Sequence, residues 1–213
     1  MGKKVIIVNG SPRKNNNTVA VHQAAAKGAE SVGAEVEYVD LYDLNFTDCR
    51  SCLACKNRKR PVKCKCYWKD EVSPVLEEVF NTDVLILGSP IYYGEPTGQV
   101  RSFMVRSTFP AMSYDDYTSV FDGKVDVGVL LTMNAGQEYY DTAYKAKMEE
   151  YFAPYRFLNG RTEILASCDT LQVKDYSKYD MRAWNEEHKK AVYESQFPID
   201  LERAFLMGAE LSR

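Results

Sequence analysis

The chain has 213 residues, of which 45% are hydrophobic and 27% charged, a composition typical of a globular protein that buries a core without disulfides or metals. Its 27 basic and 30 acidic residues give a net charge of −3, which argues against a general nucleic-acid-binding protein. The apolar run Val5–Val8 is too short for a signal peptide, and no run approaches the roughly 20 residues of a membrane span. We therefore expect a cytoplasmic protein without a membrane span, whose six cysteines are reduced.

Short β-branched or leucine-rich segments alternate with helical patterns along the chain, and this alternation predicts a parallel sheet with helices on both faces. Val36 and Tyr38 alternate with glutamates, as in a strand at a sheet edge. The expected strands cover residues 4–8, 35–41, 84–88, 125–132 and 162–166. The expected helices cover residues 18–32, 72–80, 98–107, 139–151, 181–196 and 200–211.

Two connections are longer than such a sheet requires, and long connections in compact domains are usually functional or mobile. Residues 43–70 carry five of the six cysteines, and residues 108–123 are rich in Tyr and Asp. We expect a single domain over residues 1–213, with a Cys-rich insertion at about 43–70 and a C-terminal helical extension from about 180.

The loop after the first strand, residues 9–18, is neither a Walker loop nor a dinucleotide-binding G-x-G-x-x-G turn. It offers hydroxyls, amides, a guanidinium and the free N–H groups of a helix N-terminus, a set that suits a terminal phosphate group. The alternative is a capping loop in which Asn17 or Thr18 caps the helix. The polar side chains in question are Ser11, Arg13, Asn15, Asn16, Asn17 and Thr18.

The loop after the third strand, residues 88–98, combines two prolines, three glycines and two adjacent tyrosines. Such a loop can lie against a planar ring and bind its edge through backbone amides. The alternative is a plain turn before a helix with Thr97 as its cap, which leaves Tyr92 and Tyr93 unexplained. Residues 132–137 place further small and polar side chains at the same edge of the sheet.

Three features together resemble one known family. They are Gly-Ser-Pro-Arg-x4-Thr at residues 10–18, Ser-Pro-Ile-Tyr-Tyr-Gly at residues 89–94 leading into Gly98-Gln99-Val100, and a cysteine group between them. This combination resembles the NADPH-dependent FMN reductase and iron–sulfur flavoprotein family. The resemblance implies a flavodoxin-like, doubly wound five-stranded parallel sheet of order 2-1-3-4-5 with helices on both faces.

The resemblance also implies bound FMN at the carboxyl edge of the sheet, reduced by NAD(P)H and oxidised by a small acceptor such as a quinone or free flavin, or by a redox protein. No acid or base side chain is needed, since the hydride chemistry belongs to the flavin. We read His22 and His188 as structural or solvated. A homodimer or higher homo-oligomer is implied as well. The expected FMN-binding residues are Ser11, Arg13, Asn15, Asn17, Thr18, Pro90, Ile91, Tyr92, Tyr93, Gly94, Thr132, Asn134 and Gly136.

The cysteines Cys49-x2-Cys52-x2-Cys55 are followed by Cys64-x-Cys66. Three thiols at short spacing and a fourth further on can hold a [4Fe–4S] cluster, with Cys64 or Cys66 as the fourth ligand. The gap before that fourth cysteine is longer here than in family members with a cluster. Free thiols and a zinc site are the two alternatives.

A run of six basic residues, with no acid from Arg50 to Lys69, lies among these thiols. One reading is a solvated loop whose charges balance nearby carboxylates. The other is a functional role, in which the run lowers the pKa values of the thiols or attracts an anion such as the NADP 2′-phosphate or an acidic redox partner. The members are Lys56, Arg58, Lys59, Arg60, Lys63 and Lys65.

Two further functions stay open beside the FMN-dependent oxidoreductase. One is an iron–sulfur flavoprotein that relays single electrons. The other, from a different class, is a regulatory receiver-like module without a flavin, against which Asn9-Gly10 stands where a receiver needs an acidic pair for Mg²⁺. The many tyrosines near the flavin loops would form either a pocket wall or a subunit contact.

Overall fold

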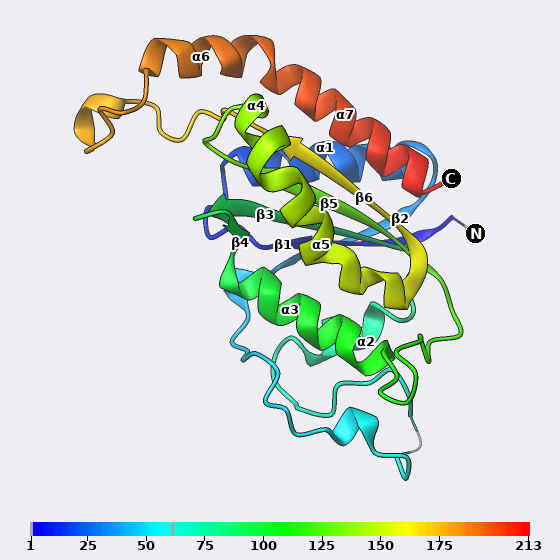
Figure 1. The fold of residues 1–213 in the computed structure, drawn as a ribbon. Helices are drawn as coiled ribbons and strands as arrows, with labels where there is room; N and C mark the ends of the chain where they lie inside the picture. Colours follow the sequence, from blue (N-terminus) through cyan, green and yellow to red (C-terminus); the bar gives the residue numbers. More distant parts are fainter. Residues whose placement is uncertain (1, 61) are drawn as a thin grey trace.

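The computed structural model describes residues 2–60 and 62–213, which fold around a twisted parallel sheet (Figure 1). The strands are β1 (Lys4–Asn9), β2 (Glu35–Asp40), β3 (Val84–Tyr92), β4 (Glu95–Pro96), β5 (Val125–Thr132) and β6 (Asn159–Ser167). Five of them are parallel in the order β2-β1-β3-β5-β6, and β4 pairs antiparallel with the end of β3. Apart from the two-residue β4 this is the predicted order 2-1-3-4-5, so the flavodoxin-like prediction is confirmed.

Helices cover both faces of the sheet, as the alternation of strands and helices requires. They are α1 (Asn17–Ser31), α2 (Ser73–Glu78), α3 (Gly98–Thr108), α4 (Gln137–Tyr139), α5 (Lys145–Phe152), α6 (Glu186–Ser195) and α7 (Phe197–Leu211). In Figure 1, α1 and α7 lie on one side of the sheet, and α2, α3 and α5 on the other. The cysteine-bearing segment, drawn in cyan, extends beyond α2 and α3.

Strand β1 shows why the sequence forms this centre. Its side chains alternate between two cores, because successive residues of a strand point to opposite faces. Val5 and Ile7 pack in the cluster that includes α1 and α7, whereas Ile6 and Val8 pack in the cluster that includes α3 and α5. All four side chains are buried, which explains why the strand reads as a continuous apolar run.

Helices α1 and α7 approach each other closely through glycine. A side chain on Gly28 would overlap the carbonyl oxygen of Phe205, and one on Gly208 would overlap the carbonyl oxygen of Ala25. Each helix therefore lays its backbone directly against the other, a contact that any larger residue would prevent. Both helices have 15 residues, and no helix in the described ranges is long and apolar enough to cross a membrane.

The predicted elements differ from the observed ones mainly at their ends. The expected helix 139–151 is interrupted by a π-helical turn over Tyr140–Tyr144, and the expected helix 181–196 begins only at Glu186. Asn16 caps α1, with its side chain accepting from the Asn17 amide, so the alternative in which Asn17 or Thr18 caps the helix names the wrong residue. Pro198 lies in the first turn of α7, where its missing N–H costs no helical bond.

Candidate functional site

The carboxyl ends of β1, β3 and β5 meet at one edge of the sheet and surround a cavity of about 100 Å³, which we call the edge cavity. Parallel strands bring their following loops together at this edge, which is why residues far apart in sequence share one site. The structure gathers nine of the thirteen expected FMN-binding residues there. They are Ser11, Arg13, Asn17, Thr18, Pro90, Ile91, Tyr92, Thr132 and Asn134.

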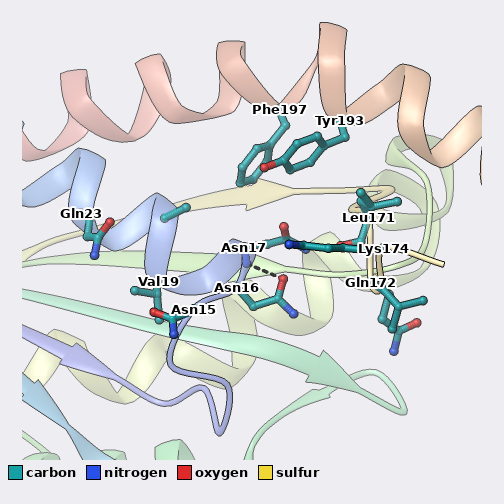
Figure 2. A pocket seen from close by; sticks show the side chains of 12 residues that line it. Asn15, Asn16, Asn17, Val19, Gln23, Leu171, Gln172, Lys174, Tyr193 and Phe197 are labelled. Atoms are coloured by element: carbon teal, nitrogen blue, oxygen red, sulfur yellow. Dashed lines mark hydrogen bonds between the residues drawn. The ribbon is translucent and has the colours of Figure 1, made fainter.

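The four other expected residues do not line the edge cavity. Asn15 lines a neighbouring cavity on the far side of Asn17 (Figure 2). Tyr93 is fully exposed, with a backbone φ of 51°, and Gly136 borders open space. Gly94 has a φ of 77°, which favours glycine, and a side chain there would meet the Tyr144 ring at 2.9 Å.

Hydrogen bonds fix the two loops of the edge cavity to each other. The Asn9 side chain accepts from the Ser11 amide at 3.0 Å, and the Ser11 hydroxyl accepts from the Arg13 amide at 3.2 Å. Thr97 stands at the N-cap position of α3, but its hydroxyl donates to the carbonyl of Gly10 at 2.9 Å instead of capping the helix. The β1–α1 and β3–α3 loops are therefore joined before any ligand arrives.

Three residues expected at the phosphate already have protein partners. The Arg13 guanidinium donates to the carbonyl of Gln172 at 2.9 Å, and the Asn17 amide donates to the carbonyl of Leu171 at 2.9 Å. The Thr18 and Thr132 hydroxyls are buried and lie 2.7 Å apart. The segment after β6 is thus part of the site. Sequence analysis missed this segment, which contributes Thr170 and Gln172 to the lining of the edge cavity. Asn16 and Met133, which lie in the two loops that the sequence points to, line it as well.

Asn134 shows how the C-terminal extension supports the edge cavity. Its carbonyl accepts from the Lys189 ammonium at 2.6 Å, and Lys189 also pairs with Asp169, which follows β6. Lys189 is 1% exposed. The side-chain oxygen of Asn134 is buried and has no hydrogen-bond partner among the described residues. An unpaired buried acceptor at the wall of a cavity suits a ligand N–H group, such as that of a flavin ring.

A second, largely apolar cavity in the insertion collects thiols. Cys49, Cys52, Cys55 and Cys66 line it, and we call it the thiol cavity. Cys64 lines a different cavity, together with Lys56, Arg58, Arg60 and Lys63. All six cysteines are free thiols, and in residues 2–60 and 62–213 no three His, Cys, Asp or Glu side chains are placed to hold a single metal ion.

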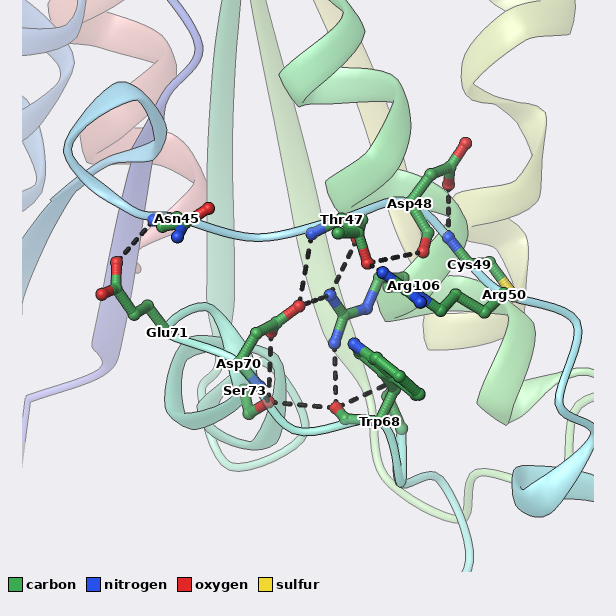
Figure 3. Close-up of polar contacts among 11 residues, drawn as sticks. Asn45, Thr47, Asp48, Cys49, Arg50, Trp68, Asp70, Glu71, Ser73 and Arg106 are labelled. Atoms are coloured by element: carbon green, nitrogen blue, oxygen red, sulfur yellow. Dashed lines mark hydrogen bonds and ion pairs between the residues drawn. The ribbon is translucent and has the colours of Figure 1, made fainter.

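Arg106 belongs to α3, and its side chain, which is 1% exposed, contacts residues of the insertion. Figure 3 shows its guanidinium between the two arms of the insertion. It donates to the carbonyl of Thr47 at 2.9 Å, the carbonyl of Trp68 at 3.0 Å and the carboxylate of Asp70 at 2.5 Å. Burial alone would raise the pKa of Asp70, but hydrogen bonds from Arg106, Thr47 and Ser73 hold it below its usual value.

Part of the basic run in the insertion is bound to protein groups. The Lys56 ammonium donates to the carbonyls of Phe109 and Met112, Arg58 pairs with Asp115 at 2.9 Å, and Lys65 pairs with Glu77 at 2.8 Å. Burial raises the pKa of the Cys55 thiol and raises that of Cys64 to about 11, in each case against the effect of Lys56. Lys56 thus acts on the pKa values of these two thiols in the direction that one reading of the run predicts, but the effect of burial is larger and the net shift is upward.

The histidines take no part in the edge cavity. His22 is fully buried beneath β3, where a side chain on Gly88 would overlap its ring, and neither ring nitrogen bonds to a described residue. Burial lowers the pKa of His22 to about 3. His188 is exposed and bonds to Asp169 at 2.5 Å. Tyr92 lines the edge cavity, while Tyr139 and Tyr144 are not among its lining residues and pack edge to face with ring centroids 5.1 Å apart.

Comparison with known proteins adds three findings to this geometry. The sequence profile described as NADPH-dependent FMN reductase matches residues 3–143. An iron–sulfur flavoprotein of Archaeoglobus fulgidus is 33% identical over 137 residues, which are 64% of this chain and 63% of that protein. One of Methanocaldococcus jannaschii is 33% identical over 135 residues, 63% of this chain and 66% of its own length. The matched region thus spans less than two thirds of either relative.

Among solved structures, an NAD(P)H:quinone oxidoreductase from Methanothermobacter marburgensis superposes with a TM-score of 0.75 at 17% identity. The superposition covers 100% of this chain and 98% of that one. At this identity the similarity shows a shared fold.

Proposed function

Because the chain belongs to the NADPH-dependent FMN reductase family, we propose that it is an FMN-dependent oxidoreductase that passes electrons from NAD(P)H to a small acceptor such as a quinone or free flavin. FMN, the cofactor of this family, supplies the hydride-accepting ring when it is bound. The observation that carries the proposal is the edge cavity, where nine residues expected from the sequence meet at the carboxyl ends of three strands. Family membership argues against the receiver-like alternative.

The residues of the edge cavity divide into two groups by chemistry. Ser11 and Arg13 lie in the loop before α1 and Asn17 is the first residue of that helix, so helix amides and a guanidinium lie near one another and favour a phosphate. Pro90, Ile91 and Tyr92 present a flat, largely apolar surface that suits one face of the ring.

In the part of the edge cavity that follows β5, the unpaired Asn134 oxygen would accept a ring N–H. No side chain of the site needs to act as an acid or a base. These residues hold and orient the cofactor, and polar groups fixed in advance lower the free energy of charge that develops on reduction.

Titration with FMN tests this proposal. We expect the purified protein to be yellow, and the apoprotein to quench FMN fluorescence on binding. Ser11→Ala would weaken binding about tenfold, equivalent to roughly 1.4 kcal/mol, because its hydroxyl organises the phosphate loop. Lys14→Ala is the matched control, since Lys14 lies in the same loop but pairs with Asp43 at the surface. A colourless protein that takes up no FMN would contradict the proposal.

The thiol cavity favours a second candidate, an iron–sulfur flavoprotein that carries single electrons. Four thiolates around one apolar cavity are the ligand set that a [4Fe–4S] cluster requires. In this candidate Cys49, Cys52, Cys55 and Cys66 would hold the cluster. Cys66 is preferred over Cys64 as the fourth ligand, because Cys64 lines another cavity.

Anaerobic reconstitution with iron and sulfide tests the second candidate. The loaded protein should show an absorbance near ~400 nm that bleaches on reduction. Cys66→Ser should abolish this band and the bound iron, whereas Cys64→Ser should retain both. Equal iron contents in the two variants, or none in the wild-type protein, would exclude this ligand set.

A further inference from the structure

Arg106 has one N–H group for which the fold provides no acceptor. Its two terminal nitrogens donate to the carbonyls of Thr47 and Trp68 and to the carboxylate of Asp70 (Figure 3). The third nitrogen, Nε, is buried and has no hydrogen-bond partner among the described residues. A buried donor without an acceptor costs free energy, and such groups in native proteins call for an explanation. An acceptor from a bound group would stabilise Arg106 at this position.

The guanidinium of Arg106 lies at the wall of the thiol cavity, which it lines together with the four cysteines. Because Thr47, Trp68 and Asp70 hold both terminal nitrogens, the plane of the guanidinium is fixed and Nε has little freedom to turn to another carbonyl. Burial alone would lower the pKa of Arg106, but Asp70 and the Cys66 sulfur raise it. The sulfur of Cys66 is therefore close enough to interact with this charge.

The rest of the thiol cavity makes the charge of Arg106 effective. The wall contains the apolar residues Leu53, Val105, Phe109 and Pro110. No Asp or Glu is among the described residues that line it. Arg50, which also lines it, is exposed and stacks on Trp68, with the guanidinium carbon 4.2 Å from the ring centroid. Charges interact more strongly in an apolar surrounding than in water, so the buried Arg106 acts strongly on any charge held there.

We propose that Nε of Arg106 donates a hydrogen bond to a sulfur atom of an iron–sulfur cluster held in the thiol cavity and thereby raises the reduction potential of that cluster. The inference rests on the second candidate function and adds to its four thiolates a residue that is not a ligand. Reduction adds one electron and one negative charge, so a donor and a cation beside the sulfur stabilise the reduced form more than the oxidised form. Asp70 acts in the opposite direction, because its carboxylate compensates part of the guanidinium charge.

Pulsed EPR spectroscopy of the anaerobically reconstituted and reduced protein tests the hydrogen bond. The protein is produced with arginine that carries ¹⁵N at its guanidinium nitrogens. We expect a ¹⁵N hyperfine coupling to the cluster that persists in Arg50→Lys and disappears in Arg106→Lys. Absence of this coupling from the wild-type protein, or its persistence in Arg106→Lys, would overturn the inference.

Redox titration with dithionite tests the effect on the potential. Arg106→Lys keeps the charge but removes the Nε–H group, and it should lower the midpoint potential by ~59 mV, equivalent to a tenfold change in the ratio of reduced to oxidised cluster. Asp70→Asn should raise the potential, because the guanidinium charge is then uncompensated. Arg101→Lys is the matched control, since Arg101 also belongs to α3 but lies over the Tyr151 ring and outside the thiol cavity. A purely structural role of Arg106 does not predict shifts of opposite sign.

The outcomes separate this inference from the function on which it rests. A loaded Asp70→Asn variant whose potential falls or stays unchanged would overturn the inference and leave the second candidate standing. This measurement and the wild-type EPR spectrum decide the question even where Arg106→Lys does not fold. Failure of the wild-type protein to take up iron and sulfide would contradict the second candidate itself, while FMN binding in the edge cavity would be unaffected.

Discussion

At the scale of single residues, the fold buries two side chains that are charged or can become charged, Arg106 and His22. Arg106 is almost wholly buried and satisfies acceptors from residues 47, 68 and 70, which lie on both arms of the insertion. His22 is buried with no hydrogen-bond partner among the described residues. The first side chain is stabilised by its partners, whereas the second is tolerated only while it stays neutral.

Replacing Arg106 by Met should destabilise the protein strongly. The change removes the partner of the Asp70 carboxylate, which is 13% exposed, and of two carbonyl groups, so we expect a loss of about 3 kcal/mol in the free energy of unfolding. Urea denaturation followed by tryptophan fluorescence measures it. Arg58→Met is the control, because the Arg58–Asp115 pair is exposed, and it should cost less than about 1 kcal/mol. Similar losses in both variants would show that burial of Arg106 is not decisive.

His22 predicts a specific loss of stability in acid. Its pKa is about 3 in the folded protein and near 6.5 when unfolded, so the unfolded state binds the extra proton below pH 6.5. The contribution of His22 to the free energy of unfolding should therefore fall by about 2 kcal/mol from pH 7 to pH 5. His22→Leu should remove this part of the decrease, as measured by urea unfolding at pH 7, 6 and 5. An unchanged pH dependence in the variant would refute the assignment.

At the scale of elements, the contact between α1 and α7 depends on the absence of side chains at Gly28 and Gly208. Side chains of the C-terminal helix α7 pack in the same buried cluster as Val5 and Ile7 of the sheet. Close approach of two helix backbones fixes their relative position more tightly than side-chain packing alone. The position of α7, in turn, sets where α6 and Phe197 stand relative to the edge of the sheet.

Gly208→Ala should destabilise the protein although alanine is the better helix former. The added Cβ would overlap the Ala25 carbonyl, and overpacking typically costs 1–3 kcal/mol against a gain of about 1 kcal/mol from helix propensity. We expect a lower urea midpoint for Gly208→Ala. Gly136→Ala is the control, since Gly136 has a φ of −72° and open space around it, and its midpoint should stay within error of the wild type. Equal midpoints in the two variants would mean that the helices can separate at little cost.

At the scale of the whole molecule, the C-terminal extension reaches back to the flavin edge through Lys189. Lys189→Met would free the Asn134 carbonyl and leave Asp169 without its buried partner, so we expect FMN affinity to fall about tenfold. Fluorescence titration measures this, and Lys189→Arg should restore part of the affinity. Lys190→Met is the neighbouring control, because Lys190 pairs with Glu186 at the surface. Equal FMN affinity in the Lys189→Met and Lys190→Met variants would contradict this role.

Much of this organisation could be predicted from the sequence, because it depends on local patterns. Buried parallel strands read as apolar runs, and the loops that follow them must meet at one edge, which is why the sequence points to residues 11–18, 90–94 and 132–136. Within the last two ranges only residues 90–92 and 132–134 line the edge cavity. The segment after β6 also follows a parallel strand, but nothing in its own residues showed which of them enter the site. Its part in the site depends on hydrogen bonds from Arg13 and Asn17 across more than 150 residues of sequence.

Other residues escaped prediction because nothing local marks them. Lys189 and Arg106 lie in helices whose charged residues normally face solvent, and only the tertiary fold buries them. The spacing of the thiols also could not show whether Cys64 or Cys66 joins the other three cysteines, since the direction of each side chain depends on how the insertion folds. One local detail of that folding is the left-handed backbone at Cys64, which has a φ of 53°.

The Arg106 contacts also bear on how the length of the insertion can change. Because the guanidinium joins Thr47 to Trp68 and Asp70, the residues between them form a closed loop whose ends are held independently of its middle. The entropy of closing such a loop grows only with the logarithm of its length, so doubling it costs about 0.6 kcal/mol. Residues can therefore be gained or lost between Cys55 and Cys66 without disturbing the sheet. The longer gap in this chain is a change that the fold tolerates at little thermodynamic cost.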